Sequence, residues 1–584
     1  MARIQPVRAT QYMKKKLFVH SKKILAWSLL AVMAVFSVTG CGIYEDTSLP
    51  GSQIKEEDVN DENKYDILKS LKIRSEEMPL VEGEVPERDD SEKVSYEMPG
   101  IDVYAPIVKG SGEKNAEVVL CAREQDSEVI GIVKKAAEIY NENNADSVTV
   151  RVIEPALVKD FLLSGASIPD GIIIENEIFG KYFESEGTEL QQIAKTLIPD
   201  AAGVAISKNV YMPLKDRIHN EADIARETVE GNLMIAYSSP LNNPTGLNFA
   251  VSMLSSFDEA NPNSMEAAEN FGVFQGHVAD VSYSPSQMMS AAKNGRINAF
   301  VIEKQKYIKN DFAEDFVFIP VGERQDYPLY CTASTDENIK SVLEGFAGTF
   351  GEEPVSSMIN EYGFNTEDYE TPDSMKDLEP SEVSDIVKYW KETKNAGKNV
   401  AAVFVSDVSG SMDGIKMKNL RKSLYSAMGQ ISPATRTGFI SFNGDVHIEL
   451  PIGPFNEENQ AYFAGAIERL DTWHSINGTA TVNAVLEAVR VLYEDEEVQN
   501  GTCRPAVILL ADGQTNVGHS IDETAALLKA FGYPVYAIGY GENPGEDIDE
   551  GELKKIADVT GGEYINSSAE DIGYILNILF ESEL

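Results

Sequence analysis

Two periods of hydrophobic spacing alternate along the last third of the chain. Apolar runs such as 400–406 and 506–511 are short, rich in β-branched residues and bounded by polar turns, which predicts buried strands. Segments such as 415–429 and 521–531 place apolar residues three or four positions apart, which predicts amphipathic helices. Strands that alternate with helices, with one hairpin among them, predict a doubly wound α/β sheet over 399–584 that carries one antiparallel edge strand.

A second region of alternating strands and helices runs from residue 117 to about 364. Its first predicted strands and helix are 118–120, 148–153, 171–174 and 129–140. This alternation predicts parallel sheet with crossover helices. After the polar stretch 366–377, helical spacing returns at 381–394, which predicts a helix that links the two α/β regions.

The first forty residues have the pattern of a secretory signal. Lysines precede an uncharged apolar run, 24–38, that is too short for a comfortable membrane span. The run closes on Thr39-Gly40-Cys41, and here the chain resembles bacterial lipoprotein precursors. The resemblance implies cleavage of 1–40, lipid on Cys41 and a location on the extracellular face of the cell membrane, with an uncleaved anchor helix as the alternative.

Charge and cysteine content limit the function classes. The formal net charge of −44 over 584 residues disfavours nucleic acid, whose phosphates such a surface repels, and favours cations. Residues 41–115 are rich in Glu, Asp, Lys, Pro and Ser and predict an acidic, disordered stalk. Beyond Cys41 only Cys121, Cys331 and Cys503 remain, which excludes a disulfide framework and a Cys-rich zinc site. Buried thiols are expected, and a disulfide between the first two stays the alternative.

Three segments of the C-terminal region carry oxygen-bearing side chains where a predicted strand ends or a predicted helix begins. The residues concerned are Asp407, Ser409, Ser411, Thr479 and Asp512. In a doubly wound sheet such positions meet at the carboxyl edge, so two carboxylates and three hydroxyls can face one point. Hard oxygen donors of this kind favour Mg²⁺, with Mn²⁺ or Ca²⁺ as alternatives, over zinc or copper. On its own, Asp-x-Ser-x-Ser fits a helix cap equally well.

These segments resemble the metal-ion-dependent adhesion site (MIDAS) of von Willebrand factor A (VWA) domains. The family pattern is Asp-x-Ser-x-Ser, a Thr after a glycine loop, and Asp-Gly, and the whole of 399–584 follows the family's order of elements. The resemblance implies that the two serines bind the metal directly, the threonine directly or through water, and the two aspartates mainly through water. Asn477 departs from the pattern, because bacterial members often have a second glycine there, but Asn tolerates positive φ.

The charge of this site points to binding and not to catalysis. Two carboxylates balance a divalent ion, and the resemblance implies that an acidic residue of a protein partner takes an exchangeable position on the metal. A metal-assisted hydrolase is the alternative. However, these loops hold no His, Lys or third carboxylate as a base, and the chain has no P-loop and no Gly-x-Ser-x-Gly elbow. The sequence therefore predicts that the protein is not an enzyme.

Residues 117 to about 364 resemble, more loosely, the two-lobed bacterial extracellular solute-binding proteins, a type II periplasmic-binding-protein-like fold. The resemblance rests on 233–248 (LMIAYSSPLNNPTGLN) and on 284–307, which contains KNGRINAFVIEKQKY. A helix that starts at Asn243-Pro244 turns free N–H groups towards a cleft, which favours an anionic solute. The candidate ligand-binding residues are Arg123, Glu175, Asn176, Ser238, Ser239, Thr245 and Glu303. Each of them alone fits a capping or solvated side chain equally well.

The combined prediction divides the chain into a signal peptide, an acidic stalk, a two-lobed domain, a linker helix and a VWA domain, at 1–40, 41–115, 116–370, 371–398 and 399–584. The two lobes are expected to be joined near 201–206 and 319–331 and to close around a solute. The VWA domain is expected to bind a protein partner through its metal, while the two-lobed domain binds or senses a small solute. The alternatives are the substrate-binding component of an ABC-type transport system and, third, the hydrolase.

Overall fold

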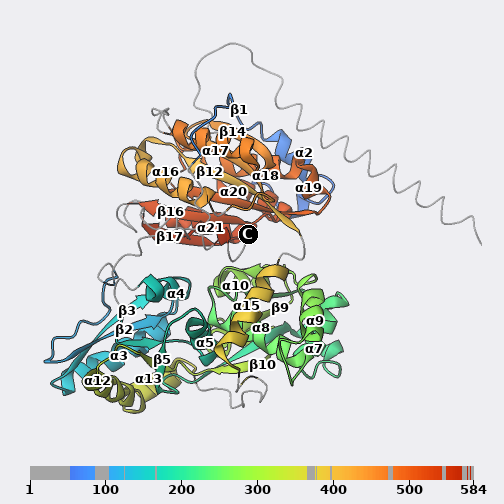
Figure 1. The fold of residues 1–584 in the computed structure, drawn as a ribbon. Helices are drawn as coiled ribbons and strands as arrows, with labels where there is room; N and C mark the ends of the chain where they lie inside the picture. Colours follow the sequence, from blue (N-terminus) through green and yellow to red (C-terminus); the bar gives the residue numbers. More distant parts are fainter. Residues whose placement is uncertain are drawn as a thin grey trace, which may run out of the picture. The chain divides into compact units, whose positions relative to one another are not determined.

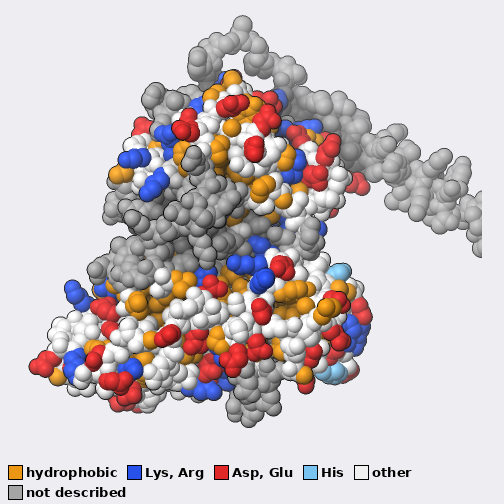
Figure 2. Space-filling model, viewed as in Figure 1, with side chains coloured by type: hydrophobic (Ala, Val, Ile, Leu, Met, Phe, Trp, Pro, Cys, Tyr) orange, Lys and Arg blue, Asp and Glu red, His pale blue; other side chains and the backbone are white. Residues whose placement is uncertain are grey.

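The computed structural model describes residues 53–85, 101, 104–123, 125–164, 168–364, 375, 378–394, 398–429, 431–470, 478–513, 515–541, 548–568, 575–576 and 579–580. The predicted signal peptide, Cys41 and Asn477 lie outside these ranges. Within them, no helix combines the length and the apolar character needed to cross a membrane. Acidic and basic side chains are interspersed over the face drawn in Figure 2.

The C-terminal domain is built on a seven-stranded sheet with the order β1-β14-β13-β12-β15-β16-β17 (Figure 1). The strands are β1 (Ser75–Glu77), β12 (Asn399–Asp407), β13 (Arg436–Phe442), β14 (Val446–Pro454), β15 (Cys503–Ala511), β16 (Val535–Gly541) and β17 (Tyr564–Ser568). β12 pairs in parallel with β13 and β15, whereas β13 and β14 form the predicted antiparallel hairpin. The doubly wound sheet predicted from the sequence is confirmed.

Helices cover both faces of this sheet, because successive residues of a strand point to opposite sides. Ala402 and Phe404 of β12 share a core with α16 and α17, whereas Val403 and Val405 share a core with α18 and α20. The helices are α16 (Ile415–Met428), α17 (Glu457–Arg469), α18 (Thr481–Glu494), α19 (Glu496–Gln499), α20 (Ile521–Phe531) and α21 (Glu550–Thr560). The two apolar cores fix the central strands and therefore the loops at their carboxyl ends.

Residues 53–85, which we call the strap, contradict the prediction of a disordered stalk. They form η1 (Glu56–Asp58), α2 (Lys64–Ser70) and β1, and β1 pairs in parallel with β14. Leu68 of α2 is buried in the core that contains α18 and α20, and Arg469 Nη1 donates to Pro79 O at 2.9 Å. Ile67, Leu68 and Leu71 have helical spacing and pack on this core, but the high charge of the surrounding residues makes such a short helix hard to predict from the sequence. β14, predicted as the edge strand, is therefore an inner strand.

The region before the C-terminal domain forms two lobes, each around a five-stranded sheet. Lobe 1 has the order β3-β2-β4-β11-β5, with β2 (Asn115–Cys121), β3 (Ser147–Ile153), β4 (Gly171–Ile173), β5 (Leu190–Ala194) and β11 (Leu329–Thr332). Lobe 2 has the order β10-β6-β9-β7-β8, with β6 (Asp200–Ser207), β7 (Ile235–Ser238), β8 (Asp280–Ser282), β9 (Ala299–Glu303) and β10 (Phe316–Gln325). Both sheets are mixed and not purely parallel, because β11 is antiparallel to its neighbours and β6 is antiparallel to β9 and β10.

The chain passes between the lobes twice, after β5 and again between β10 and β11. The second passage falls within the predicted 319–331, and the first lies just before the predicted 201–206. Lobe 1 carries α3 (Ser127–Asn143), α4 (Pro155–Ser164), α5 (Glu177–Ser185), α12 (Glu337–Gly348) and α13 (Val355–Glu361). Lobe 2 carries α6 (Lys208–Leu214), α7 (Glu221–Val229), α8 (Pro244–Phe257), α9 (Met265–Gln275), α10 (Pro285–Lys293) and α11 (Lys304–Lys309).

The predicted linker helix is α15 (Pro380–Thr393), and it packs into the bilobed domain. Val383 and Ile386 belong to the core that contains Phe249 of α8. Trp390 is fully buried, and its Nε1 donates to Tyr237 OH at 2.8 Å. The helix is therefore part of the bilobed domain as well as a connection.

The three cysteines within the described residues are Cys121, Cys331 and Cys503, and all are buried free thiols. The expectation of buried thiols is confirmed, and the alternative disulfide is not formed. Burial raises the pKa of the Cys121 thiol well above its ordinary value, which keeps it protonated and unreactive.

Candidate functional site

The first candidate site lies at the carboxyl edge of the C-terminal sheet, where β12 and β15 end side by side. Ser406 of β12 is paired with Leu510 of β15, so the residues that follow bring Asp407 and Asp512 to the same edge. Both aspartates are fully buried. Two neighbouring carboxyl groups are thus held away from bulk water, which favours a positive ion between them.

The loop after β12 gathers the two predicted serines. Ser409 N donates to Asp407 Oδ1 at 2.7 Å, which turns the loop back onto the carboxylate that begins it. The Oγ atoms of Ser409 and Ser411 lie 3.0 Å apart, across the short 3-10 turn η5 (Gly410–Met412). The alternate spacing of Asp-x-Ser-x-Ser therefore places both hydroxyls together beside Asp407.

Thr479 approaches from the loop before α18. Its N–H donates to Asn516 Oδ1 at 2.9 Å, and Asn516 N donates to Thr479 O at 3.0 Å. Gly478 has φ of +124°, and Val517 lies where a β-carbon at Gly478 would be. These contacts join the loop that follows Asp512 to the loop that carries Thr479. Asn516 was not predicted, because a lone Asn in a polar loop has no distinguishing signal in the sequence.

The electrostatics of this edge fit the predicted donor set. Burial, and after it the negative charge of Asp512, raises the pKa of Asp407 to about 7. Asp407 Oδ2 is buried and has no hydrogen-bond partner among the described residues. A buried acceptor without a donor destabilises the folded state unless a bound ligand supplies the missing contact. In the described part of the chain, no three His, Cys, Asp or Glu side chains form a metal cluster, so a metal at this edge needs the hydroxyls as well.

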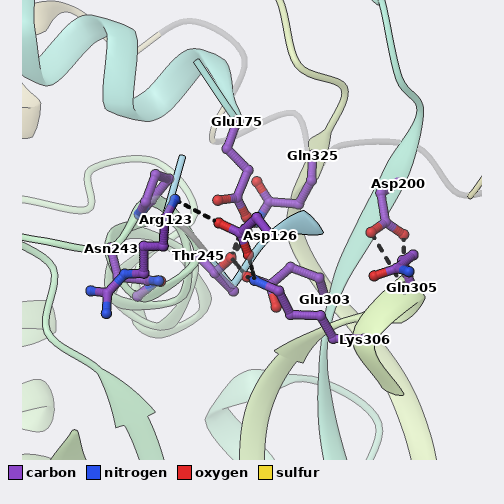
Figure 3. A network of polar contacts seen from close by, with 12 residues as sticks. Arg123, Asp126, Glu175, Asp200, Asn243, Thr245, Glu303, Gln305, Lys306 and Gln325 are labelled. Carbon is purple, nitrogen blue, oxygen red and sulfur yellow. Dashed lines mark hydrogen bonds and ion pairs between the residues drawn. The ribbon is translucent and has the colours of Figure 1, made fainter. Parts of the chain in front are cut away.

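The second candidate site lies between the two lobes, where Figure 3 shows Glu175, Thr245 and Gln325 close together. Thr245, near the start of α8 in lobe 2, has its Oγ1 2.6 Å from Glu175 Oε1 of lobe 1 and 2.7 Å from Glu303 Oε1 of lobe 2. Gln325 Nε2 donates to the same hydroxyl at 3.1 Å. Three of the predicted ligand-binding residues therefore meet at one point, and they contact one another.

Two further predicted residues fasten the lobes together. Asn176 Oδ1 accepts from Phe179 N as the N-cap of α5, and Asn176 Nδ2 donates to Gln325 Oε1 at 2.6 Å. Arg123 Nη2 donates to Tyr283 O at 2.8 Å, so its guanidinium reaches from lobe 1 to a backbone carbonyl of lobe 2. Each residue has a structural partner, which is the alternative that the sequence left open.

The two predicted serines lie beside this point, at the end of β7. Ser238 is buried, and its Oγ has no hydrogen-bond partner within the described ranges. Ser239 Oγ accepts from Leu241 N at 3.4 Å, which is a local turn contact. Asn243 caps α8 as predicted, with its side chain accepting from Gly246 N.

Sequence reasoning missed three charged residues of this site. Lys306 Nζ lies 2.9 Å from Asp126 Oδ1 and 3.3 Å from Glu303 Oε1. Asp200 accepts from the backbone N of Ala201 at 2.8 Å and lies to one side of this cluster (Figure 3). In the sequence these residues look like charged side chains at element ends, and only the fold brings them together.

Burial controls the charge of this cluster. Burial, and after it the charge of Glu303, raises the pKa of Glu175 well above its ordinary value. Burial also raises the pKa of Asp200 to about 8. Burial opposes the charged form of Lys306, but Asp126 and Glu303 outweigh it and raise the pKa of the ammonium. The start of α8, where an anion was expected, faces two carboxyl groups of the chain itself.

Comparison with known proteins bears on both regions. Residues 402–577 match the family model of the von Willebrand factor type A domain. This region is a VWA domain. A curated relative, inter-alpha-trypsin inhibitor heavy chain H3 from Bos taurus, is 30% identical over 154 residues, which are 24% of this chain and only 16% of that protein.

Two solved structures are similar to the two regions in turn. BatB from Bacteroides thetaiotaomicron is 18% identical, and the match covers 31% of this chain and 96% of that one, with a TM-score of 0.26. A periplasmic thiamin binding protein is 14% identical over 49% of this chain and 98% of that one, with a TM-score of 0.36. At these identities the likeness concerns the fold alone. The predicted fold class, a two-lobed α/β domain followed by a doubly wound VWA domain, is confirmed.

Proposed function

We propose that this protein is a lipid-anchored extracellular binding protein with two binding sites and no enzymatic activity. Its VWA domain binds a protein partner through a divalent metal, and its bilobed domain binds a small solute. The residues proposed to hold the metal, with Mg²⁺ as the first choice, are Asp407, Ser409, Ser411, Thr479 and Asp512. The proposed anchor is lipid on Cys41.

The observation that carries the proposal is the state of Asp407. Its carboxyl group is fully buried, one oxygen accepts from Ser409 N, and the other has no partner among the described residues. A buried carboxylate in this state destabilises a fold unless a positive charge completes it. Neighbouring Asp512 adds a second carboxyl group, and the paired hydroxyls of Ser409 and Ser411 add neutral oxygens. This combination is what Mg²⁺ prefers.

Exposure of the donors supports binding of a partner at the same point. Asp407 and Ser409 are buried, whereas Ser411 is exposed, so the donor set opens to solvent on the serine side. A bound Mg²⁺ is octahedral and keeps some of its waters, and a carboxylate from another protein can replace one of them. The hydrogen bond between Thr479 and Asn516 joins the loop that carries Thr479 to the loop that follows Asp512, which fixes the positions of these donors.

Chelator-dependent capture tests this proposal. The purified full chain is immobilised and exposed to extracted surface proteins in Mg²⁺ and in EDTA, alongside a Ser409→Ala/Ser411→Ala variant. Ser423→Ala, a buried serine of α16 in the same domain, is the matched control. We expect one partner to bind the wild type and the control in Mg²⁺ and to be lost in EDTA and with the double variant. A partner that stays bound in EDTA and to the double variant contradicts the proposal.

A further inference from the structure

A small, partly open cavity adjoins the cluster between the lobes. Its volume is about 140 Å³, and its lining includes Arg123, Asp126, Asp200, Glu303, Lys306 and Tyr327. Three of these six residues are carboxylic acids, and Glu175 lies directly behind, on the other side of the Thr245 hydroxyl. The cavity is large enough for a few solvent molecules or one small ligand.

Positive charges inside the cleft are fewer than the acidic groups around it. Lys306 is shared by Asp126 and Glu303. The Arg123 guanidinium is turned towards the backbone carbonyls of Asn242 and Tyr283. Two carboxyl groups, those of Glu175 and Asp200, are therefore left without a cation among the contacts of the described residues.

A proton on one of the carboxyl groups compensates for a missing cation in this cluster. A hydroxyl carries one hydrogen, so Thr245 donates to only one of the two carboxyl groups that lie within 2.7 Å of its oxygen. The third neighbour of this oxygen, Gln325 Nε2, is itself a donor and cannot accept a hydrogen bond. The Thr245 hydrogen must therefore point to one of the two carboxyl groups. The other carboxyl group can approach so closely only if it carries a proton of its own. The raised pKa of Glu175 agrees with this arrangement.

One acceptor in this cluster remains without a partner. Glu303 is 2% exposed, and its Oε2 has no hydrogen-bond partner within the described part of the chain. The same carboxyl group already binds the ammonium of Lys306 through Oε1. The residues that line the cavity therefore include a carboxyl group with one unsatisfied oxygen, and an ammonium group is a suitable donor to it.

We propose that the cleft binds a small organic cation with a primary ammonium group, which donates to Glu303 Oε2 and replaces a proton held between the lobes. This inference rests on the proposed solute-binding role and names the class of solute. A metal ion fits less well, because the described residues contain no cluster of three acidic or His/Cys side chains at metal-binding geometry. An anion fits less well, because the start of α8 already faces Glu175 and Glu303.

Calorimetric titration of the full chain with ethanolamine and with putrescine tests the inference. Acetate, sulfate and tetramethylammonium, which has no N–H group, are titrated in parallel. We expect both amines to bind, with affinity that rises with pH as the protein gives up its proton, and with a heat that depends on the ionisation enthalpy of the buffer. We expect the other three probes to bind at least about tenfold more weakly, because none of them offers an N–H donor to the buried carboxylate.

Two variants give the test its control. Glu303→Gln is expected to weaken amine binding about tenfold or more, whereas Glu323→Gln is expected to leave it unchanged. Glu323 is a partly buried carboxyl of the same domain whose pKa burial raises to about 8, and it lies outside the cavity lining. Thermal unfolding shows whether each variant is folded, and Asp126→Asn replaces Glu303→Gln as the test variant should the latter unfold.

The outcomes separate this inference from the proposed function. Equal amine binding by wild type and Glu303→Gln overturns the inference. Binding of acetate or sulfate in place of the amines also overturns it but leaves a solute-binding domain. Absence of binding by every probe overturns the inference, and metal-dependent capture of a protein partner then decides the VWA half of the proposal independently.

Discussion

The carbonyl oxygen of Val81 in the strap lies against the α-carbon of Gly465 in α17 so closely that no β-carbon fits between them. A β-carbon at Gly83 would in turn overlap the backbone of Gly465. Two backbones therefore touch, and the strap follows a groove that exists only because position 465 has no side chain. The strap is an integral part of the VWA domain, and 399–584 alone lacks the strand β1.

Gly465→Ala tests this contact. Alanine favours a helix over glycine by about 0.5–1 kcal/mol, but here the added methyl must displace the strap, so we expect a net loss of about 1–3 kcal/mol. Gly348→Ala, at a helical glycine with open space around it, is the control and is expected to gain stability. Hydrogen exchange should show faster exchange of β1 in the first variant only. Unchanged protection of β1 in Gly465→Ala would mean that the strap is held elsewhere.

The hydroxyl of Thr245 can be tested as the bridge between the lobes. Thr245→Val keeps the shape but removes the hydroxyl that both Glu175 and Glu303 contact, so we expect the free energy of unfolding to fall by about 1–3 kcal/mol. Thr228→Val is the matched control, because that buried hydroxyl donates only to a helix carbonyl, that of Ile224, at 2.8 Å. Urea unfolding measures both. An equal decrease in the free energy of unfolding of the two variants would show that the Thr245 hydroxyl contributes no more than an ordinary buried hydroxyl.

Asp200 predicts a dependence of stability on pH. Burial raises its pKa from 3.8 to about 8, so between these values the folded protein binds a proton that the unfolded chain does not. The stability that this proton contributes is complete below about pH 4 and is lost as pH rises towards 8. Asp200→Asn removes the titration. From roughly pH 5.5 to 8, wild type is expected to lose about 1–3 kcal/mol relative to the variant, as measured by urea unfolding. Parallel profiles would contradict the assignment.

The sequence was sufficient for elements with a strong hydrophobic period. Helix 521–531 and the strands around 400–406 and 506–511 have the predicted places, because the helix buries one apolar face and the strands bury both of theirs whatever the rest of the chain does. The strand Ser75–Glu77 could not be predicted, since its Ser-Glu-Glu sequence has no apolar face and gains its pairing only from β14. The mixed character of the lobe sheets also depends on long-range pairing, such as that of β11 with β4.

The candidate sites differ in the same way. Asp407, Ser409 and Ser411 lie within one loop, so their spacing alone predicts that they gather. Lys306 and Asp126 are far apart in sequence and in different lobes, and although Lys306 stands in the segment 284–307, nothing in that segment points to Asp126 as its partner. The anion expected at the start of α8 followed from the helix alone. The carboxyl groups that face this start come from two other strands, which the sequence could not bring to that position.

The most direct measurement is the thermal unfolding of the full chain with and without Mg²⁺. A ligand that binds only the folded state stabilises it by about 2.7 kcal/mol at a hundredfold excess over its dissociation constant, which raises the melting temperature. We predict a saturable rise for wild type and Ser423→Ala, reversed by EDTA, and no rise for Ser409→Ala/Ser411→Ala. No rise in wild type, or an equal rise in the double variant, would contradict the proposal that these loops hold a metal.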